Sequence, residues 1–397
     1  MISMDALIIF GILLALAMNF VNGLNDASHS IATVVVTKAL SPWGASVSSA
    51  LANFAGPFIF TTAVAATIGT SIVVSGALTQ VSIVIAMITA ITLVFFATHV
   101  GFPLSSSQAL IGGLIGAGVA AYGPGALILP PQAMLASLGL YCLVGAVLGA
   151  ITLTVLAYWM KENIVTAFIL GLVFGIAFAV PILMLTGTLV LTGILAIVVF
   201  IFISPIIGFE VAFLFDLLVT HLFRFSRQDR MKHVFQPLQV LASLFQAAGH
   251  GANDGQHAVG VITALLVAGG VISSFIVPLW VVIVSSAAIG IGTLFGGWKV
   301  INKLAREITK IRPYQGFCAA TSGGAIIAFV TARGVPVSST QVMSGAIIGV
   351  GATRGVKAVK WEVTREMMEA WIFTIPIAFT VAWCGYMIVA LVFHLPL

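Results

Sequence analysis

Polar side chains that could bind ions gather in two short stretches of this otherwise apolar chain. The first stretch reads "NGLNDASHS" from residue 22, and the second reads "GHGANDGQHA" from residue 249. Their matching positions are Asn25, Asp26 and His29 in the first and Asn253, Asp254 and His257 in the second. Carboxylate and amide oxygens are ligands for hard cations, and histidine exchanges a proton near neutral pH. These residue types therefore predict sites for a cation or a proton.

Hydroxyl side chains form a second pair of motifs further along the chain. "PLSSSQ" begins at residue 103, and "PVSSTQ" begins at residue 336. A proline followed by hydroxyl residues is typical of a helix start, where free backbone N–H groups and the helix dipole bind anions. Two such helix ends, approaching from opposite sides, could hold a tetrahedral oxyanion. The candidate ligands are Ser105, Ser106 and Ser107 in the first motif and Ser338, Ser339 and Thr340 in the second.

The composition places these motifs inside a membrane. Of the 397 residues, 60% are hydrophobic and 7% are charged, and the mean hydropathy is +1.20. In soluble domains about a quarter of the residues are charged. Apolar runs such as "ALIIFGILLALAMNF" do not alternate as the strands of a membrane barrel do. The sequence therefore predicts an all-α integral membrane protein, and its net charge of +5, which lies in loops, does not indicate nucleic-acid binding.

About twelve transmembrane helices are expected, because a helix crosses the hydrocarbon core with roughly 20 residues. The predicted spans are residues 6–37, 43–70, 80–102, 104–121, 134–159, 164–184, 188–209, 234–268, 270–297, 313–333, 336–352 and 366–394. The first span is longer than a straight crossing needs, so we expect a tilt or a break near residues 22–25.

Basic residues indicate how the chain crosses the membrane. Arginines and lysines cluster around residues 224–232, 299–312 and 354–365. Cytoplasmic loops are enriched in these residues, so the three basic loops are expected in the cytoplasm and both termini outside it. We expect a multi-pass protein of the plasma membrane, which is the inner membrane in a bacterium.

The two motif pairs recur in the same order, which predicts a duplicated chain. Equivalent motifs lie an odd number of predicted spans apart, so one half is expected to be inverted. Inverted repeats with broken or re-entrant helices at the midplane are typical of secondary transporters. We assign residues 1–209 to the first repeat, residues 210–233 to an interfacial helix with a basic linker, and residues 234–397 to the second repeat.

An aspartate inside a membrane span is costly unless it binds a partner. No lysine or arginine lies on either Asn-Asp motif, so a proton or a cation is the expected partner of Asp26 and Asp254. A cation or proton bound between the two aspartates would favour the binding of an anion, and a bound anion would favour the binding of the cation. This mutual preference amounts to coupled symport. Structural roles stay open at this point, because the Asn-Asp pair could cap a helix break and the serines could bond to their own helices.

These four motifs, together with the layout of the spans, closely resemble the PiT family of inorganic phosphate transporters. The family signature is a G-A-N-D-x-A-N-A-like motif in each half, with P-x-S-[ST]-[ST]-[HQ] downstream. The likeness extends through "GIGTLFGGWKVINKL", residues 290–304. The resemblance implies an inverted-repeat symporter that forms a homodimer and carries phosphate with sodium ions or protons, without another cofactor.

The resemblance also implies a role for each motif residue. Phosphate would contact Ser105, Ser106, Ser107, Ser338, Ser339, Thr340, Asn25 and Asn253. The coupling ion would bind Asp26, Asn25, Gln108, Asp254, Asn253 and Gln341. His29 stands where the family motif has asparagine, and Gln108 and Gln341 stand where many members have histidine. This leaves His29 and His257 as candidate proton carriers and leaves sodium and proton coupling both open.

Other functions are compatible with the same residues. A sulfate permease of this fold is one, because sulfate and phosphate are both tetrahedral, and an anion channel is another. We do not expect an enzyme, because no nucleophile appears with a base or a metal cluster. The cysteines Cys142, Cys318 and Cys384 are scattered and lack a metal-binding spacing.

Overall fold

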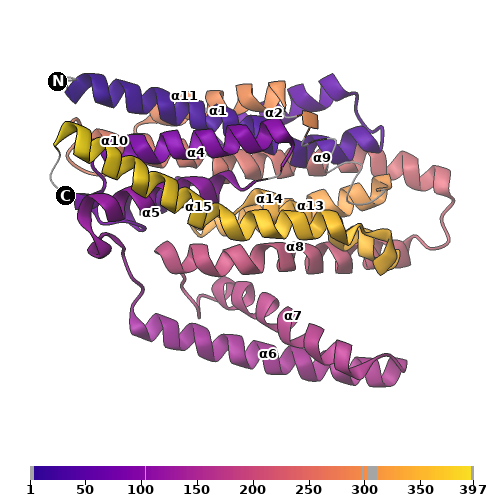
Figure 1. Cartoon of the computed structure of the whole chain (residues 1–397). Coiled ribbons are helices and arrows are strands. Elements are labelled where there is room, and N and C mark those ends of the chain that lie inside the picture. The colour runs from indigo at the N-terminus through magenta and orange to yellow at the C-terminus, as the bar shows by residue number, and fades with distance from the viewer. Residues whose placement is uncertain (1–3, 103, 297, 300, 302–310, 395–397) are drawn as a thin grey trace.

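The fold is a bundle of helices. The computed structural model describes residues 4–102, 104–296, 298–299, 301 and 311–394, and these residues form helices joined by loops and short turns (Figure 1). The helices are α1 (Met4–Val36), α2 (Pro42–Ile59), α3 (Ala63–Thr70), α4 (Gln80–Val100), α5 (Ser106–Tyr122), α6 (Gln132–Met160), α7 (Ile164–Leu185), α8 (Gly193–Leu222), α9 (Gln228–Asp254), α10 (Gln256–Ala268), α11 (Leu279–Phe295), α13 (Pro313–Ala332), α14 (Ser339–Ala352) and α15 (Trp361–Phe393). Pro103 of the first serine motif and the basic residues Lys303, Arg306 and Lys310 lie outside the described residues.

Seven of the described helices are long and apolar enough to cross a membrane, and an eighth span results if α2 and α3 count as one. These two helices meet at an angle of 77°. By contrast, α5, α10, α11 and α14 have 17, 13, 17 and 14 residues, fewer than the roughly 20 of a full crossing. The all-helical expectation is confirmed, whereas the expected number of about twelve spans is not.

The Asn-Asp motifs lie on helices of different continuity. The break expected near residues 22–25 is absent, because α1 runs as one helix of 33 residues through the motif. In the second half, Gly255 separates α9 from α10 directly after Asp254. The Asn19 amide of α1 donates hydrogen bonds to the Gly255 carbonyl (2.9 Å) and to the Ser285 carbonyl (3.1 Å). A side chain of the first half thus bonds to the backbone at the interruption in the second.

The structure differs from the expected interfacial helix at residues 210–233. Residues 210–222 continue α8, a helix of 30 residues, and α9 begins at Gln228. Glu210 and Asp216, which lie in this stretch, are both buried. Asp216 accepts a hydrogen bond of 2.6 Å from Thr353, which follows α14. Packing of α8 against α14 therefore covers these acids.

Equivalent helices of the two halves have equivalent neighbours. α1 carries the first Asn-Asp motif and packs against α4 and α11. Its equivalent α9 packs against α13 and α2, which are the equivalents of α4 and α11. Likewise α5 packs against α15, and its equivalent α14 packs against α8. Equivalent motifs thus share equivalent surroundings.

Glycines bring these helix pairs into backbone contact. A Cβ atom at Gly23 would overlap the backbone of α11, and one at Gly251 would overlap the backbone of α2. Gly116 lies in the same way against Phe379 of α15, and Gly349 against Phe209 of α8. Small residues at such crossings let helices in a membrane approach closely. These crossings fix where α1, α5, α9 and α14 meet along the length of the bundle.

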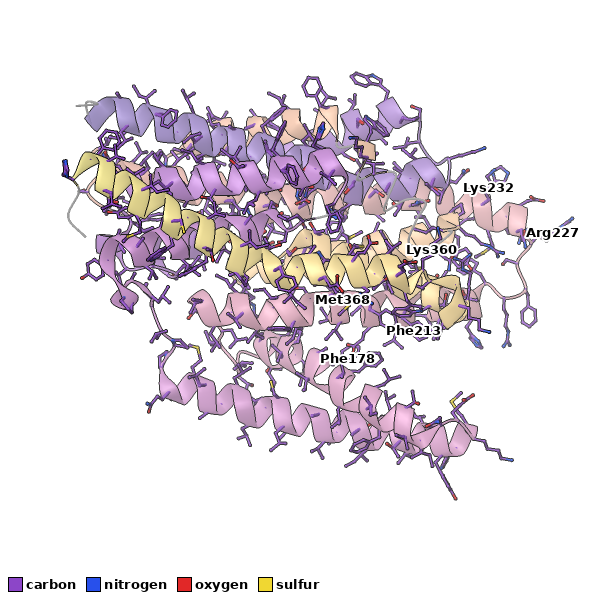
Figure 2. All side chains as sticks on the ribbon, viewed as in Figure 1. Phe178, Phe213, Arg227, Lys232, Lys360 and Met368 are labelled. Atoms are coloured by element: carbon purple, nitrogen blue, oxygen red, sulfur yellow. The ribbon has the colours of Figure 1, made fainter. Side chains whose placement is uncertain are left out.

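The bundle has a basic end and an opposite end that holds both termini. The start of α1 and the end of α15 lie at the same end of the molecule, and the turn between α8 and α9 lies at the other (Figure 1). Arg227 and Lys232 extend from that turn region (Figure 2). This arrangement agrees with the expectation that both termini lie on one side and the basic loops on the other. Which side faces the cytoplasm stays a prediction.

We predict that Gly349→Ala destabilises the protein, because the new methyl group would overlap the Phe209 carbonyl and force α14 away from α8. Overpacking of this kind costs about 1–3 kcal/mol. The matched control is Gly139→Ala on α6, where the described residues leave the added Cβ free of contacts within 4 Å. Thermal unfolding of the purified protein in detergent should show a lower midpoint for the first variant alone. Equal midpoints would show that this crossing tolerates a side chain.

Candidate functional site

The two serine motifs form the N-terminal ends of α5 and α14. Ser105 is the N-cap of α5, and its hydroxyl oxygen accepts a hydrogen bond of 3.3 Å from the Gln108 backbone N–H. Ser338 caps α14 in the same way, with 3.3 Å to the Gln341 N–H. The sequence-predicted helix starts are therefore confirmed. Of each hydroxyl triplet, the first member caps the helix, and the other two lie in its first turn.

Asp26 contacts both serine motifs. Its carboxylate accepts hydrogen bonds from Ser106 at 3.1 Å and from Thr340 at 3.0 Å. A third bond comes from the neighbouring Asn25 amide at 2.7 Å. Ser107 of the first motif in turn donates to the Val337 carbonyl of the second, at 3.1 Å. One buried carboxylate thus joins the starts of α5 and α14, which are far apart in the sequence.

The second Asn-Asp motif repeats part of this arrangement. Asp254 accepts a hydrogen bond of 3.0 Å from Ser339, which corresponds to the bond between Asp26 and Ser106. Each asparagine bonds the helix that precedes a serine motif: Thr98 donates to Asn25 at 3.0 Å, and Asn253 donates to Thr331 at 2.9 Å. The structure therefore brings both Asn-Asp motifs and both serine motifs into one buried site.

A further residue, His250, lies between the two aspartates. Its Nε2 atom is 3.5 Å from an Asp26 oxygen and 3.3 Å from an Asp254 oxygen. Its Nδ1 atom is 2.6 Å from the side-chain oxygen of Asn53 on α2. The Asn53 amide nitrogen donates to the Ser49 carbonyl at 3.1 Å, so its oxygen accepts from His250. Nδ1 is therefore the protonated nitrogen, and a second proton on Nε2 would place a positive charge between two carboxylates.

His250 was not predicted from the sequence, although its spacing contained a signal. His250 precedes Asp254 by four residues on α9, so both side chains lie on one face of that helix. The matching position in the first half is Asn22, whose side-chain oxygen accepts a bond of 2.7 Å from Ser106. The site is therefore asymmetric at this position, with an imidazole in one half and an amide in the other.

The remaining predicted residues carry unpaired polar atoms. His29 Nδ1 lies 3.7 Å from Asp26, beyond hydrogen-bonding distance. Among the described residues, neither ring nitrogen of His29 or His257 has a hydrogen-bond partner, and the side-chain amides of Gln108 and Gln341 have none. All four side chains are buried. Buried polar atoms are nearly always paired, so unpaired ones here indicate groups that can bind a ligand.

The charges of the site suit a cation and an anion together. Oxygen and nitrogen atoms of Asp26, His250 and Asp254 lie within 4.8 Å of one another, a spacing that could hold a cation. The first turns of α5 and α14 offer hydroxyl and backbone donors for an oxyanion. The side chains of this site are almost completely buried, so a ligand there would be closed off from water.

Comparison with known proteins identifies relatives along nearly the whole chain. A "Probable low-affinity inorganic phosphate transporter" of Rhizobium meliloti (strain 1021) is 36% identical over 381 residues, which cover 94% of this chain and 96% of the relative. A protein of the same description from Bacillus subtilis (strain 168) is 34% identical and covers 98% of this chain and all of its own length (100%). A solved structure described as "The sodium-dependent phosphate transporter" has a TM-score of 0.69 and 23% identity, covering 97% of this chain and 99% of its own. That last likeness concerns the fold.

A family model also matches most of the chain. The model described as the phosphate transporter family matches residues 22–382, a range that contains all four motifs. The resemblance drawn from those motifs is thereby confirmed. The chain belongs to the phosphate transporter family.

Proposed function

We propose that this chain is a cation-coupled symporter that carries inorganic phosphate into the cell across the plasma membrane. One observation carries the proposal: Asp26 accepts hydrogen bonds from the first turns of both α5 and α14. An acidic cation ligand thereby lies in contact with two helix ends of the kind that bind anions. The names of the relatives, which describe phosphate transport, support phosphate as the substrate.

Phosphate binds between the starts of α5 and α14 in this proposal. Ser106, Ser107, Ser339 and Thr340 supply hydroxyl donors there, and the free N–H groups of each first turn add to them. Ser105 and Ser338 shape the two helix ends as N-caps. Asn25 and Asn253 hold the preceding helices in place through Thr98 and Thr331. We assign the four hydroxyl donors to contacts with phosphate. We assign the two N-cap serines and the two asparagines to the immediate surroundings of the phosphate.

The coupling ion binds at the aspartates. Asp26 and Asp254 repel an incoming anion, and a sodium ion or proton at these carboxylates removes that repulsion. The unpaired amides of Gln108 and Gln341 offer oxygen ligands to the same ion or donors to phosphate. Each ligand then raises the affinity for the other by the same factor, as thermodynamic linkage requires.

The choice between sodium and protons rests on different observations. Sodium is supported by the description of the structural neighbour, which names a sodium-dependent transporter. Protons are supported by His250 between two carboxylates and by His29 at 3.7 Å from Asp26. We favour sodium as the driving ion, with His250 as a fixed positive charge that partly neutralises the aspartates.

Burial of the site favours a carrier over a channel. Asp26, Asp254 and the hydroxyl residues are almost completely covered by other side chains. A channel would expose such residues along a continuous aqueous path, whereas a carrier closes its site between openings to either side. The equivalent helix crossings of the two halves support an inverted repeat that opens alternately.

The expected homodimer is also a proposal. α6 and α7 pack mainly against each other through Gly145, Gly149, Gly171 and Gly175, and only α7 contacts α8 closely. The pair lies at one side of the bundle in Figure 1. We assign this pair, whose outer faces are apolar, to contacts with lipid and with a second copy.

We predict that purified protein in liposomes takes up labelled phosphate when an inward sodium gradient is imposed and much less without one. Separate runs with only a proton gradient distinguish the coupling ion. Sulfate at a moderate excess should compete weakly. Stronger block by sulfate than by unlabelled phosphate would identify a sulfate permease, and uptake that ignores both gradients would identify a channel.

We predict that Asp26→Asn and Asp254→Asn each lower coupled uptake by about tenfold or more, since hydrogen bonds to a charged group are worth about 1.5–3 kcal/mol. The amide keeps the size of the side chain but loses the charge that binds the cation. The control is Glu162→Gln in the exposed loop between α6 and α7. Size-exclusion profiles should match the native protein for all three. Near-native uptake by both site variants would refute the assigned role.

We predict that His250→Asn impairs uptake throughout the range from about pH 5.5 to 8, in which an ordinary histidine changes charge, because it removes the fixed positive charge that lies between Asp26 and Asp254. Asparagine occupies the matching position in the first half, so the fold should accept it. His233→Asn, at an exposed position on the same helix, is the control. Initial uptake rates under a fixed sodium gradient provide the measurement. Unchanged rates across the pH range would remove His250 from the mechanism.

A further inference from the structure

Two rows of polar side chains face each other where α1 and α9 pack together, between the site and the basic end of the bundle. Their members recur every three or four residues, so each row occupies one face of its helix. The row on α9 consists of Gln239, Ser243, Gln246 and His250, and the row on α1 consists of Asp26, Ser30 and Thr33, continued by Thr37 directly after the helix. All eight side chains are buried. We call them the polar rows.

The polar rows are joined at both ends. At the site, His250 Nε2 lies 3.5 Å from an Asp26 oxygen. At the other end, Thr37 donates a hydrogen bond of 2.8 Å to the Gln239 side-chain oxygen. At about 1.5 Å per helical residue, Gln239 lies roughly 22 Å along α9 from Asp254. The rows therefore extend from the site toward the basic end of the bundle.

Several polar atoms between these ends have no partner among the described residues. They are the Thr33 hydroxyl, the Ser243 hydroxyl and both amide atoms of Gln246. Burying polar groups without hydrogen bonds is costly. A contact that only held two helices together would not need them.

The matching contact in the other half shows that apolar residues suffice. The positions that match Gln239, Ser243 and Gln246 are Gly11, Ala15 and Met18 on α1. The positions that match Ser30, Thr33 and Thr37 are Ala258, Val261 and Leu265 on α10. Gly11 lies against Leu265, as Gln239 lies against Thr37. The same helix contact is thus polar on one side of the site and apolar on the other.

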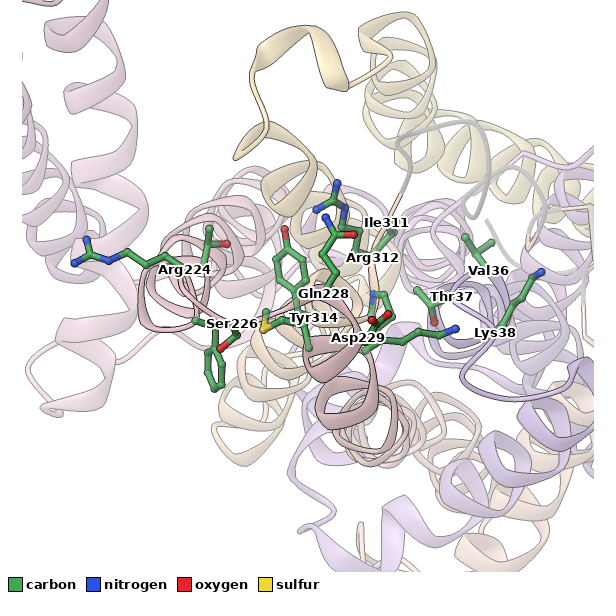
Figure 3. Close-up of a pocket in the computed structure, with 15 residues that line it drawn as sticks. Val36, Thr37, Lys38, Arg224, Ser226, Gln228, Asp229, Ile311, Arg312 and Tyr314 are labelled. Atoms are coloured by element: carbon green, nitrogen blue, oxygen red, sulfur yellow. The ribbon is translucent and has the colours of Figure 1, made fainter.

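A cavity lies at the outer end of the polar rows. Its volume is about 520 Å³, and Thr37 lines it. Four cationic side chains, Lys38, Arg224, Lys232 and Arg312, line it together with one acid, Asp229. Figure 3 shows Thr37 and Lys38 on one side, Arg224 and Ser226 on the opposite side, and Gln228, Arg312 and Tyr314 between them. The excess of positive charge raises the local concentration of anions.

We propose that the polar rows are the route by which the transported oxyanion leaves the site, and that the basic cavity is a second, transient oxyanion site at the mouth of this route. The hydrogen bond between Thr37 and Gln239 closes the route between the two sites. When α1 and α9 separate, the unpaired hydroxyl and amide groups replace water around the anion. The proposal rests on the proposed phosphate transport, and the route leads toward the basic face, which we expect to lie in the cytoplasm.

A labelling experiment tests the route without measuring phosphate transport. Cys142, Cys318 and Cys384 are first replaced by alanine, and Ser243→Cys is then compared with Ala15→Cys, the matching position in the apolar contact. A membrane-impermeant, negatively charged thiol reagent is added to inside-out vesicles. We expect the Ser243→Cys variant to react roughly tenfold faster, because reactivity follows exposure of the thiol. Equal rates, or reaction only from the opposite face, would overturn the route.

An uptake experiment tests whether the anion uses the route. The double variant Thr33→Val, Gln246→Met keeps side-chain size and makes the rows apolar. We expect phosphate uptake to fall roughly tenfold, since the path no longer solvates an anion, whereas phosphate still raises the unfolding temperature of the purified protein. Thr263→Val on α10 is the matched control, because that hydroxyl bonds only to its own helix among the described residues, at 2.7 Å to Val259.

The outcomes separate the two proposals. Uptake by the double variant within about twofold of the native rate would overturn the route. Loss of the phosphate-induced rise in unfolding temperature would also overturn it, because the substitutions would then act on phosphate binding at the central site. Failure of the native protein to take up phosphate under any gradient would refute the proposed function. In that case the labelling rates alone decide whether the polar rows open to water.

Discussion

Two buried carboxylates that share one histidine are the constraint on which this structure depends. Asp26 and Asp254 would repel each other and would be costly to bury alone. The imidazole of His250 lies between them, and hydroxyl groups from the starts of α5 and α14 donate hydrogen bonds to them. A site built in this way is stable when its charge is balanced, and a bound cation or anion would alter that balance.

The glycine crossings make this site possible. Short helices such as α5 and α14 can start inside the membrane only if their neighbours cover their free ends. Gly116 and Gly349 let α15 and α8 approach those helices at backbone distance, and Gly23 and Gly251 do the same for α1 and α9. The helix ends therefore meet in a closed polar interior. Without these close contacts, hydroxyl and carboxylate groups would face lipid.

The two halves depart from internal symmetry at the site and along the helix contact on its basic side. The two halves share their motifs, their helix neighbours and the bonds of both asparagines. They differ where His250 replaces Asn22 and where the polar rows replace an apolar contact. A symmetric carrier would offer the same path to both sides of the membrane. Here the side chains toward the basic end can form hydrogen bonds with an anion, whereas those toward the termini form an apolar contact that excludes water.

The sequence by itself determined the class of protein and the chemistry of the site. Apolar composition required membrane helices, and the duplicated "ND" and "PxSS" motifs predicted candidate ligands for a cation and an anion before any contact was known. These properties are local, because they depend on residue types and on spacing along one helix. The burial of Glu210 and Asp216, by contrast, depends on packing against a distant helix.

Tertiary structure alone decided which of these residues meet. Thr340 bonds Asp26 across more than three hundred residues, and Thr37 bonds Gln239 across about half of the chain. His250 gained its importance only through its position between aspartates of both halves. The continuity of α1 through its motif was also invisible in the sequence, where the length of the span favoured a tilt or a break, and residues of neighbouring segments bond the Asn25 side chain within the intact helix. Such contacts depend on how helices cross, and a pattern along one helix does not contain that information.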